Sequence, residues 1–387
     1  MNQGIRYRVG RICKGVYFLE DRLMSASRKI SNMTKYSLIH LLLAVSVLPL
    51  CPRWALASEK APNRVDTKFL VLNDCDDDNK LSTAPHGDTV YMMDSHGRII
   101  RMVALALTVT SKCSRFSISE DGRFFVVCDG SPNILAVYEV ATGRKLWSLV
   151  GLFNSAVFVN DLVYASSIDS IYVIDHRGII VKHTRIGAFD LTVDRSHNSL
   201  WISGLQIKKY KLDLEPILTV GQVTGIEGPV FIEANSDGSI WLIQRDANEQ
   251  PGSQNQLAKV SSEGKLLKTI RLDLCPYCMR VDSTNGSIWV TGKGYRDLSK
   301  IGDEFPETLD ELYELAGREN CTKKYDSKGR LLFCINEGGH SLALDPFDGS
   351  VWIAGEKSIG HFSNSGKKLG AHTSVFGRKW LVPIPNG

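Results

Sequence analysis

Internal repetition dominates the sequence of this 387-residue chain and restricts the folds open to it. Four segments share a polar turn, a small residue, an aliphatic residue and a tryptophan: HNSLW at 197–201, DGSIW at 237–241, NGSIW at 285–289 and DGSVW at 348–352. Each follows a short apolar run, and an apolar strand, a tight polar turn and a second strand form a β-hairpin. Self-similarity of this kind indicates a repeat architecture and precedes every other inference about the fold.

The repeat unit has the size of a propeller blade. Fainter copies occur at 121–125, 160–164 and 78–82, and a second hairpin follows each copy, as at 170–180 and 259–267. Four strands per repeat without a helical period are typical of a blade. The aligned aromatic positions 125, 164, 201 and 241 lie 39, 37 and 40 residues apart, and the later gaps of 48 and 63 residues contain insertions. We therefore predict an all-β, seven-bladed β-propeller over 65–376, with 377–387 as a C-terminal tail; six or eight blades remain open because the first copy is faint.

The repeat phrase resembles that of exported propellers built from NHL or YVTN-type repeats, over roughly residues 65 to 376. The resemblance implies fold far more than function. The group includes streptogramin-inactivating lyases and metal-dependent lactonases, but no motif here matches their catalytic residues, so none is carried over. The repeat tryptophans Trp201, Trp241, Trp289 and Trp352 are expected to pack one blade against the next.

The first 57 residues have the order of a secretory signal. Basic residues Arg28, Lys29 and Lys35 precede an apolar run at 38–50, and Ala55-Leu56-Ala57 forms a small-residue cleavage pattern before Ser58. The apolar run is shorter than the ~20 residues of a membrane span. We predict that 1–57 is an N-terminal extension and signal peptide, and that the mature chain has no transmembrane span and is secreted or periplasmic, in the cell envelope. An uncleaved N-terminal anchor is the alternative.

The charge distribution gives no reason to expect nucleic acid as a partner. The first 57 residues carry nine Lys and Arg against two acids, so the remainder of the chain, whose total is +4, has a net charge of about −3. A mildly acidic body without a basic run lacks the electrostatic footprint of a nucleic-acid-binding protein. We expect a monomer whose ligand is a protein, peptide or glycan.

Two cysteine pairs are placed for disulfide bonds across hairpins. Cys113 and Cys128 lie symmetrically about one turn, and Cys321 and Cys334 about another. In a simple hairpin register each pair is directly opposite, at a separation that a disulfide accepts. A glycine bulge at either turn would shift that register by one residue. Disulfides in an exported chain agree with the signal sequence.

The segment Cys275-Pro276-Tyr277-Cys278 invites comparison with redox proteins. In those proteins the first cysteine precedes a helix whose N-terminus lowers its pKa, whereas a strand pattern follows here. A structural disulfide in a blade-joining loop is therefore the favoured interpretation. Cys75 has no partner in this scheme, and its acidic surroundings favour a solvated turn over a calcium site.

Two enlarged loops belong to neighbouring blades and should emerge on one face. One spans 245–256 and the other 293–320, and the second contains a pattern of apolar residues at 309–316 that predicts a short helical insertion in the sixth blade. Loops vary while blades hold them rigid, so insertions build binding surfaces. The expected binding residues on this face are Arg245, Asp246, Tyr277, Tyr295, Arg296 and His340.

Two function classes compete. A binding or scaffold propeller is favoured because no catalytic triad, phosphate loop or metal motif stands at a recognisable spacing. The alternative is a hydrolase or lyase that uses His340 as the base and Glu337 as the orienting acid, with or without a divalent metal. No cofactor is otherwise expected.

Overall fold

Seven four-stranded antiparallel sheets make up the described part of the chain. The computed structural model describes residues 69–74, 89–94, 96, 98–104, 116–129, 134–220, 229–244, 255–295, 318–355, 358–372 and 378–384. The predicted signal segment 1–57 and the helix predicted at 309–316 lie outside these residues. The propeller with seven blades is confirmed.

Each blade runs from an innermost strand at the channel to an outermost strand at the rim, and its strands follow in that order. Blade 1 has β28 (Arg378–Pro383), β1 (Phe69–Asp74), β2 (Thr89–Met93) and β3 (Ile99–Ala104); blade 2 has β4 (Phe116–Ile118), β5 (Phe124–Asp129), β6 (Ile134–Glu139) and β7 (Lys145–Val150); blade 3 has β8 (Phe153–Val159), β9 (Leu162–Ser167), β10 (Ile171–Ile174) and β11 (Ile180–Thr184). Blade 4 has β12 (Asp190–Asp194), β13 (Ser199–Ser203), β14 (Ile207–Lys211) and β15 (Pro216–Thr219); blade 5 has β16 (Pro229–Ala234), β17 (Ile240–Gln244), β18 (Gln256–Val260) and β19 (Leu266–Arg271). Blade 6 has β20 (Leu274–Val281), β21 (Ile288–Tyr295), β22 (Arg318–Tyr325) and β23 (Leu331–Ile335); blade 7 has β24 (Ser341–Leu344), β25 (Val351–Ala354), β26 (Ile359–Phe362) and β27 (Lys368–His372).

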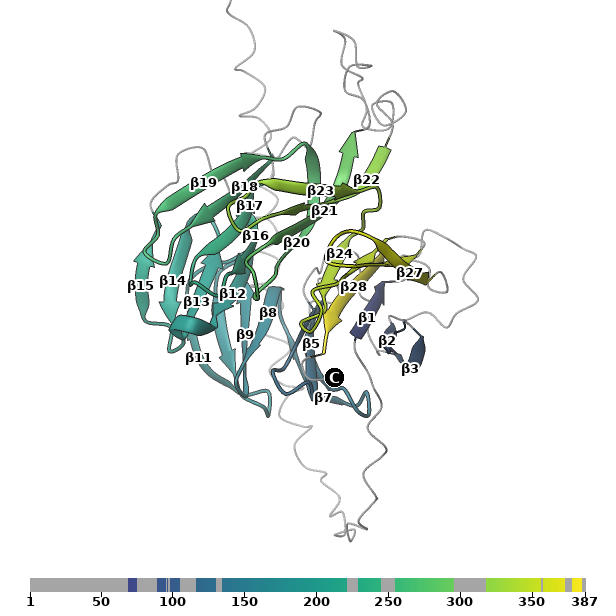
Figure 1. Cartoon of the computed structure of the whole chain (residues 1–387). Helices are drawn as coiled ribbons and strands as arrows, with labels where there is room; N and C mark the ends of the chain where they lie inside the picture. The colour runs from purple at the N-terminus through teal and green to yellow at the C-terminus, as the bar shows by residue number, and fades with distance from the viewer. Residues whose placement is uncertain are drawn as a thin grey trace, which may run out of the picture. The chain divides into compact units, whose positions relative to one another are not determined.

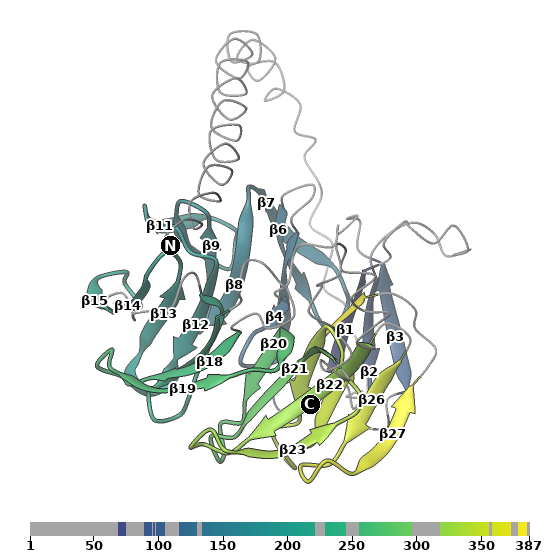
Figure 2. The same ribbon diagram turned by 90° about the horizontal axis from the view of Figure 1, so that it is seen from above.

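The innermost strands form a closed ring around a central channel. Each contacts the innermost strand of the next blade, in the order β28, β4, β8, β12, β16, β20, β24 and back to β28. Figure 1 shows the purple β1 beside the yellow β28, where the two ends of the propeller meet. Figure 2 shows the same blades turned by 90°, with the teal and green blades on one side and the yellow and purple blades on the other.

Strand β28 corrects the prediction of a C-terminal tail at 377–387. It pairs antiparallel with β1, with Val71 opposite Leu381, and it supplies the innermost strand of blade 1. The strand at 69–74 is accordingly the second strand of its blade rather than the first. A ring whose first blade takes a strand from each end of the chain ties the two ends together by backbone hydrogen bonds.

The repeat phrase forms the turn between the first and second strands, as predicted. Gly238 has φ +78°, and a Cβ atom built there would lie 2.3 Å from the imidazole of His197 in the preceding blade. Two reasons therefore require glycine at this position: the left-handed backbone conformation and the close approach of the His197 side chain. The single 3₁₀ turn among the described residues, Arg195–His197, follows β12 and has Asp194 as its N-cap.

The four repeat tryptophans pack between blades, as predicted, and each is at most 2% exposed. Trp201 packs with Ile232 and Ile240 of the next blade, and Trp289 packs with Leu342 and Val351 of the blade after its own. Trp352 completes the ring because it packs with Val71 and Leu381 of blade 1. These are the largest fully buried side chains among the described residues, so their burial between blades is a substantial stabilising contribution.

Each of these tryptophans also faces a basic or imidazole side chain across the sheet. Trp201 pairs with Lys209, Trp241 with Lys259, Trp289 with Lys324, and Trp352 with His361. The three Lys Nζ atoms lie 5.0, 5.7 and 4.7 Å from the ring centroids of their partners. The cation–π contact is thus a repeated part of the blade.

None of the helical segments within the described ranges has the length and apolar character needed to span a membrane.

Candidate functional site

The two enlarged loops leave the propeller at the same end. The second strand of blade 5 ends at Gln244, which pairs with Gln256, and the second strand of blade 6 ends at Tyr295, which pairs with Arg318. Connections between second and third strands share a face with the connections between blades, because neighbouring strands are antiparallel. We call this end the insertion face. The connection at 336–340, between β23 and β24, belongs to it.

Tyr277 and His340, two of the predicted binding residues, are in contact on the insertion face. Their ring centroids lie 5.1 Å apart at an interplanar angle of 31°, and Lys293 Nζ lies 5.6 Å from the Tyr277 centroid. All three side chains are half-buried. Tyr277 and Lys293 come from blade 6 and His340 from the connection into blade 7, so the contact joins two blades.

Hydrogen bonds hold the connection that carries His340. Thr291 Oγ1 accepts from Gly339 N at 2.8 Å, and Thr322 Oγ1 donates to the Glu337 carbonyl at 2.8 Å. A Cβ atom at Gly339 would lie 2.0 Å from the Ala354 carbonyl, so only glycine lets the chain pass here. The insertion face therefore has a rigid base beneath His340.

Glu337, the predicted partner of His340 in catalysis, is engaged elsewhere. Its carboxylate accepts a hydrogen bond from Lys368 Nζ, and the two groups form an ion pair. The structure thus assigns the Glu337 carboxylate to a lysine of blade 7 and gives no support to its role as the orienting acid of His340.

Three predicted binding residues, Arg245, Asp246 and Arg296, lie outside the described residues. Tyr295 is the last residue of β21, and its backbone pairs with Arg318. These residues stay predictions.

The segment at 275–278 lies within strand β20 rather than in a loop, which corrects that prediction. Its pairing with β21 is irregular between Pro276 and Cys278, where one extra residue is accommodated. Cys278 is buried, and its thiol donates to the Met279 carbonyl at 3.7 Å. The disulfide between Cys275 and Cys278 stays a prediction.

Cys321 and Cys334 are diagonal neighbours instead of direct partners. A bulge between Lys324 and Tyr325 shifts the register so that Cys334 lies opposite Lys323. A hydrogen bond with Cys334, together with burial, raises the pKa of the Cys321 thiol well above its usual range. The two sulfurs are therefore close, and the disulfide between them stays a prediction. Cys113, the predicted partner of Cys128, lies outside the described residues.

A second site, absent from the sequence prediction, lies inside the channel. A pocket of about 700 Å³ is lined by the innermost strands of blades 2 to 6 and by Pro383 of blade 1. Many of its residues stand at the ends of these strands or in the turns that follow them, so the pocket opens toward the face opposite the insertions. Its volume falls within the range of pockets that bind small molecules.

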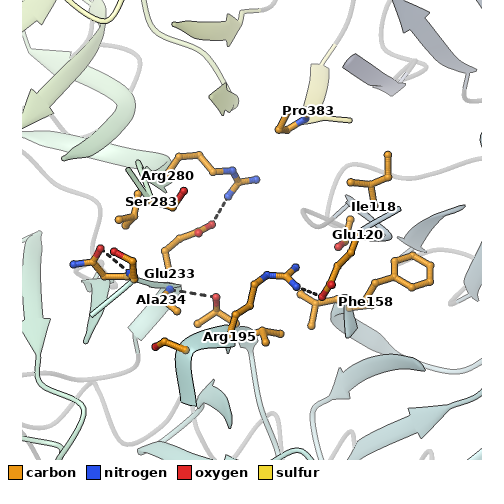
Figure 3. Close-up of a pocket in the computed structure, with 18 residues that line it drawn as sticks. Ile118, Glu120, Phe158, Arg195, Glu233, Ala234, Arg280, Ser283 and Pro383 are labelled. Carbon is orange, nitrogen blue, oxygen red and sulfur yellow. Dashed lines mark hydrogen bonds and ion pairs between the residues drawn. The ribbon is translucent and has the colours of Figure 1, made fainter. Parts of the chain in front are cut away.

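Two ion pairs dominate this pocket (Figure 3). Arg280 Nη1 donates to Glu233 Oε1 at 2.6 Å, and Arg195 donates to Glu120. The side chains of Arg280 and Glu233 are 26% and 20% exposed. Burial acts to lower the pKa of Arg280, but nearby anionic groups, including Glu233 and Asp190, outweigh it and raise that pKa above its usual range.

Two charged residues in the innermost strands could have indicated this pocket from the sequence. Glu233 and Arg280 lie directly opposite the repeat residues Trp241 and Trp289, at the position that Thr192 takes opposite Trp201. The charged side chain at that position of an apolar inner strand has to extend into the solvent of the channel or form an ion pair, because a buried unpaired charge is strongly unfavourable.

No group of three or more His, Cys, Asp or Glu side chains that could hold a metal ion occurs within the ranges that the structure describes.

Comparison with known proteins shows the architecture alone. Neither a known protein family nor a curated protein matches this sequence. Hydrazine synthase of Kuenenia stuttgartiensis is similar in structure, with 13% identity, a TM-score of 0.54, and coverage of 67% of this chain and 79% of that chain. A functionally unknown protein of Desulfotomaculum acetoxidans is similar at 12% identity and a TM-score of 0.58, with coverage of 82% of this chain and 99% of that chain. At such identities these likenesses establish that the chain has a β-propeller fold and carry no activity over to it.

Proposed function

We propose that this chain is an extracytoplasmic binding or scaffold propeller that recognises a protein, peptide or glycan on its insertion face. The observation that carries the proposal is the contact of Tyr277 with His340 on the insertion face, with Lys293 beside it. Aromatic and basic side chains on a rigid base are typical of the residues that dominate binding energy at interfaces. The signal sequence supports the extracytoplasmic location.

The competing hydrolase or lyase function has less support. It requires His340 to act with Glu337, and the carboxylate of Glu337 is paired with Lys368. Metal analysis of the purified protein separates the two functions, because a stoichiometric divalent ion would favour the enzyme.

The test is binding of the purified mature chain to arrays of defined peptides and glycans. Tyr277→Ala and His340→Ala should each weaken the strongest interaction by about tenfold or more, because truncating an aromatic contact at the centre of an interface has effects of this size. The melting temperature of each variant establishes that the blades remain intact.

The chain offers a matched control on blade 3. Tyr172 and His183 make a similar ring contact, with centroids 6.2 Å apart, on the two outer strands of blade 3, which blade 4 separates from the blades that carry the insertions. His183→Ala should leave binding unchanged. If binding survived both Tyr277→Ala and His340→Ala, the proposed surface would be wrong.

A further inference from the structure

The channel pocket is separate from the insertion face and points to a ligand of its own. Arg195 and Ser196 line it from the turn after β12, and Ser283 lines it from the turn after β20. Tyr277 lies in the first half of β20, and His340 directly precedes β24. Both therefore lie toward the end of the innermost strands that is opposite to the pocket. A ligand in this pocket therefore enters from the face without insertions.

Charges of opposite sign alternate around the pocket. In blade order they are Glu120 of blade 2, Arg195 of blade 4, Glu233 of blade 5 and Arg280 of blade 6. Figure 3 shows these four side chains reaching into the same space from different blades. One pair bridges blades 2 and 4, and the other bridges the neighbouring blades 5 and 6.

Both guanidinium groups keep donors for a ligand. Arg280 uses Nη1 for Glu233 and for the Met279 carbonyl, and Arg195 uses Nη1 for Glu120. Within the described part of the chain, the Nε and Nη2 groups of these two arginines have no hydrogen-bond acceptor. An arginine already fixed by a carboxylate presents its remaining N–H groups in a defined direction, which suits a ligand carboxylate.

A simple anion does not fit this pocket. Asp190, which is 2% exposed, accepts hydrogen bonds from the backbone of Leu191 and Ile232 and acts electrostatically on Arg280. Asp190 does not line the pocket, so the lining itself carries two carboxylates and two guanidinium groups whose formal charges cancel. A ligand has to bring a positive group together with its negative one to complement this pattern.

We propose that the channel pocket binds a short peptide with free charged termini. Its carboxylate meets the unused donors of Arg195 or Arg280, and its ammonium group meets Glu120 or Glu233 of the other pair. The serines and small apolar residues of the inner strands line the space between, and a volume of about 700 Å³ accommodates a few residues.

Calorimetry on the mature chain tests this with trialanine as the probe. Trialanine should bind, and N-acetyl-trialanine amide, which lacks both charges, should bind about tenfold more weakly or not at all. The double variant Arg280→Gln/Glu233→Gln keeps hydrogen-bonding groups but removes the charges, and it should lose trialanine binding by about tenfold. Arg177→Gln, which removes an exposed arginine paired with Asp175 on blade 3, is the control and should bind unchanged.

A single substitution tests the proposal even if the double variant does not fold. Glu120→Gln alters an ion pair whose side chains are 59% and 44% exposed, so the blades should tolerate it, and it should still weaken trialanine binding. Absence of trialanine binding, equal binding of the capped peptide, binding of maltotriose in its place, or unchanged binding by the folded variants would overturn the proposal.

Discussion

At the scale of single residues, the lysine that faces Trp201 belongs to a buried ion pair, which should contribute more to stability than the exposed ion pairs of the surface. Lys209 is 4% exposed, contacts Trp201, and pairs with Asp194 at 3.1 Å. Burial acts to raise the pKa of Asp194, but hydrogen bonds from Ser196, Lys209 and His197 outweigh it and leave that pKa below its ordinary value. The carboxylate is therefore charged in the folded state, and it needs its partners.

Lys209→Met should lower the free energy of unfolding by about 3 kcal/mol, because the variant leaves a buried carboxylate without its cation. The matched control is Lys211→Met on the same strand, whose pair with Glu215 has side chains 60% and 58% exposed and should contribute less than about 1 kcal/mol. Urea unfolding of both variants measures the difference. Equal losses would show that Lys209 contributes only as a surface charge does.

The histidines around Trp352 predict a stability that depends on pH. His361 and His372 stack on this ring with centroids 3.9 and 5.6 Å away, and burial lowers the pKa of both below the ordinary value of 6.5. Because the folded state favours the neutral imidazoles, their contribution is complete above pH 6.5 and is lost as the pH falls through the folded pKa values.

We expect the melting temperature to fall between pH 7.5 and pH 5, and to fall less in His361→Phe, which keeps an aromatic ring on Trp352 but cannot bind a proton. Melting curves at both pH values measure this. A pH dependence of the same size in the variant would assign it to other groups.

At the scale of elements, strand β28 closes the ring, and its loss is the sharpest test of the fold. A chain that ends at Gly377 lacks the innermost strand of blade 1 and exposes the edge of β1, including Val71, which is fully buried in the intact protein. We expect this truncation to abolish cooperative unfolding, as followed by circular dichroism. A chain that ends after Ile384 retains β28 and should unfold like the full-length protein; cooperative unfolding of the shorter chain would contradict this role of β28.

The same strand shows what the sequence pattern could predict and what it could not. The repeat phrase identifies a blade by its first hairpin, so six blades and the buried tryptophans followed from it directly, whereas the copy at 78–82 follows the second strand of blade 1 rather than its first. Strand β28 has no turn and partner after it, because its partner β1 is about 300 residues earlier, and it therefore resembled a tail. Pairing between chain ends leaves no local signal.

The candidate sites were partly predictable for the same reason. Tyr277 and His340 were grouped correctly because both begin or precede innermost strands of neighbouring blades. The meeting of Arg195 with Glu120 depends on ring closure across two blades and on side-chain reach, which spacing along the chain does not encode. The diagonal position of Cys321 and Cys334 depends on a bulge that the symmetric count about the turn did not include.

At the scale of the whole molecule, export and oxidation form one prediction. Expressed with its own N-terminus, the chain should be recovered outside the cytoplasm beginning at Ser58, because the Ala55-Leu56-Ala57 pattern suits a signal peptidase. Peptide mapping without reduction should then find Cys321 joined to Cys334 and Cys113 to Cys128, since oxidising compartments convert adjacent thiols to disulfides. Recovery of these cysteines as thiols from exported, folded protein would contradict the disulfide scheme.

The insertion face is expected to bind the partner while the blades only support it. Since Tyr295 and Arg318 are paired neighbours, the residues between them can be replaced by a tight hairpin turn without displacing either strand. The decisive measurement is the affinity of this shortened chain for the strongest ligand of the peptide and glycan arrays, made on protein whose melting transition matches that of the original. We predict that the shortened chain folds normally and no longer binds; normal folding with undiminished affinity would place the binding surface elsewhere and refute the proposed function.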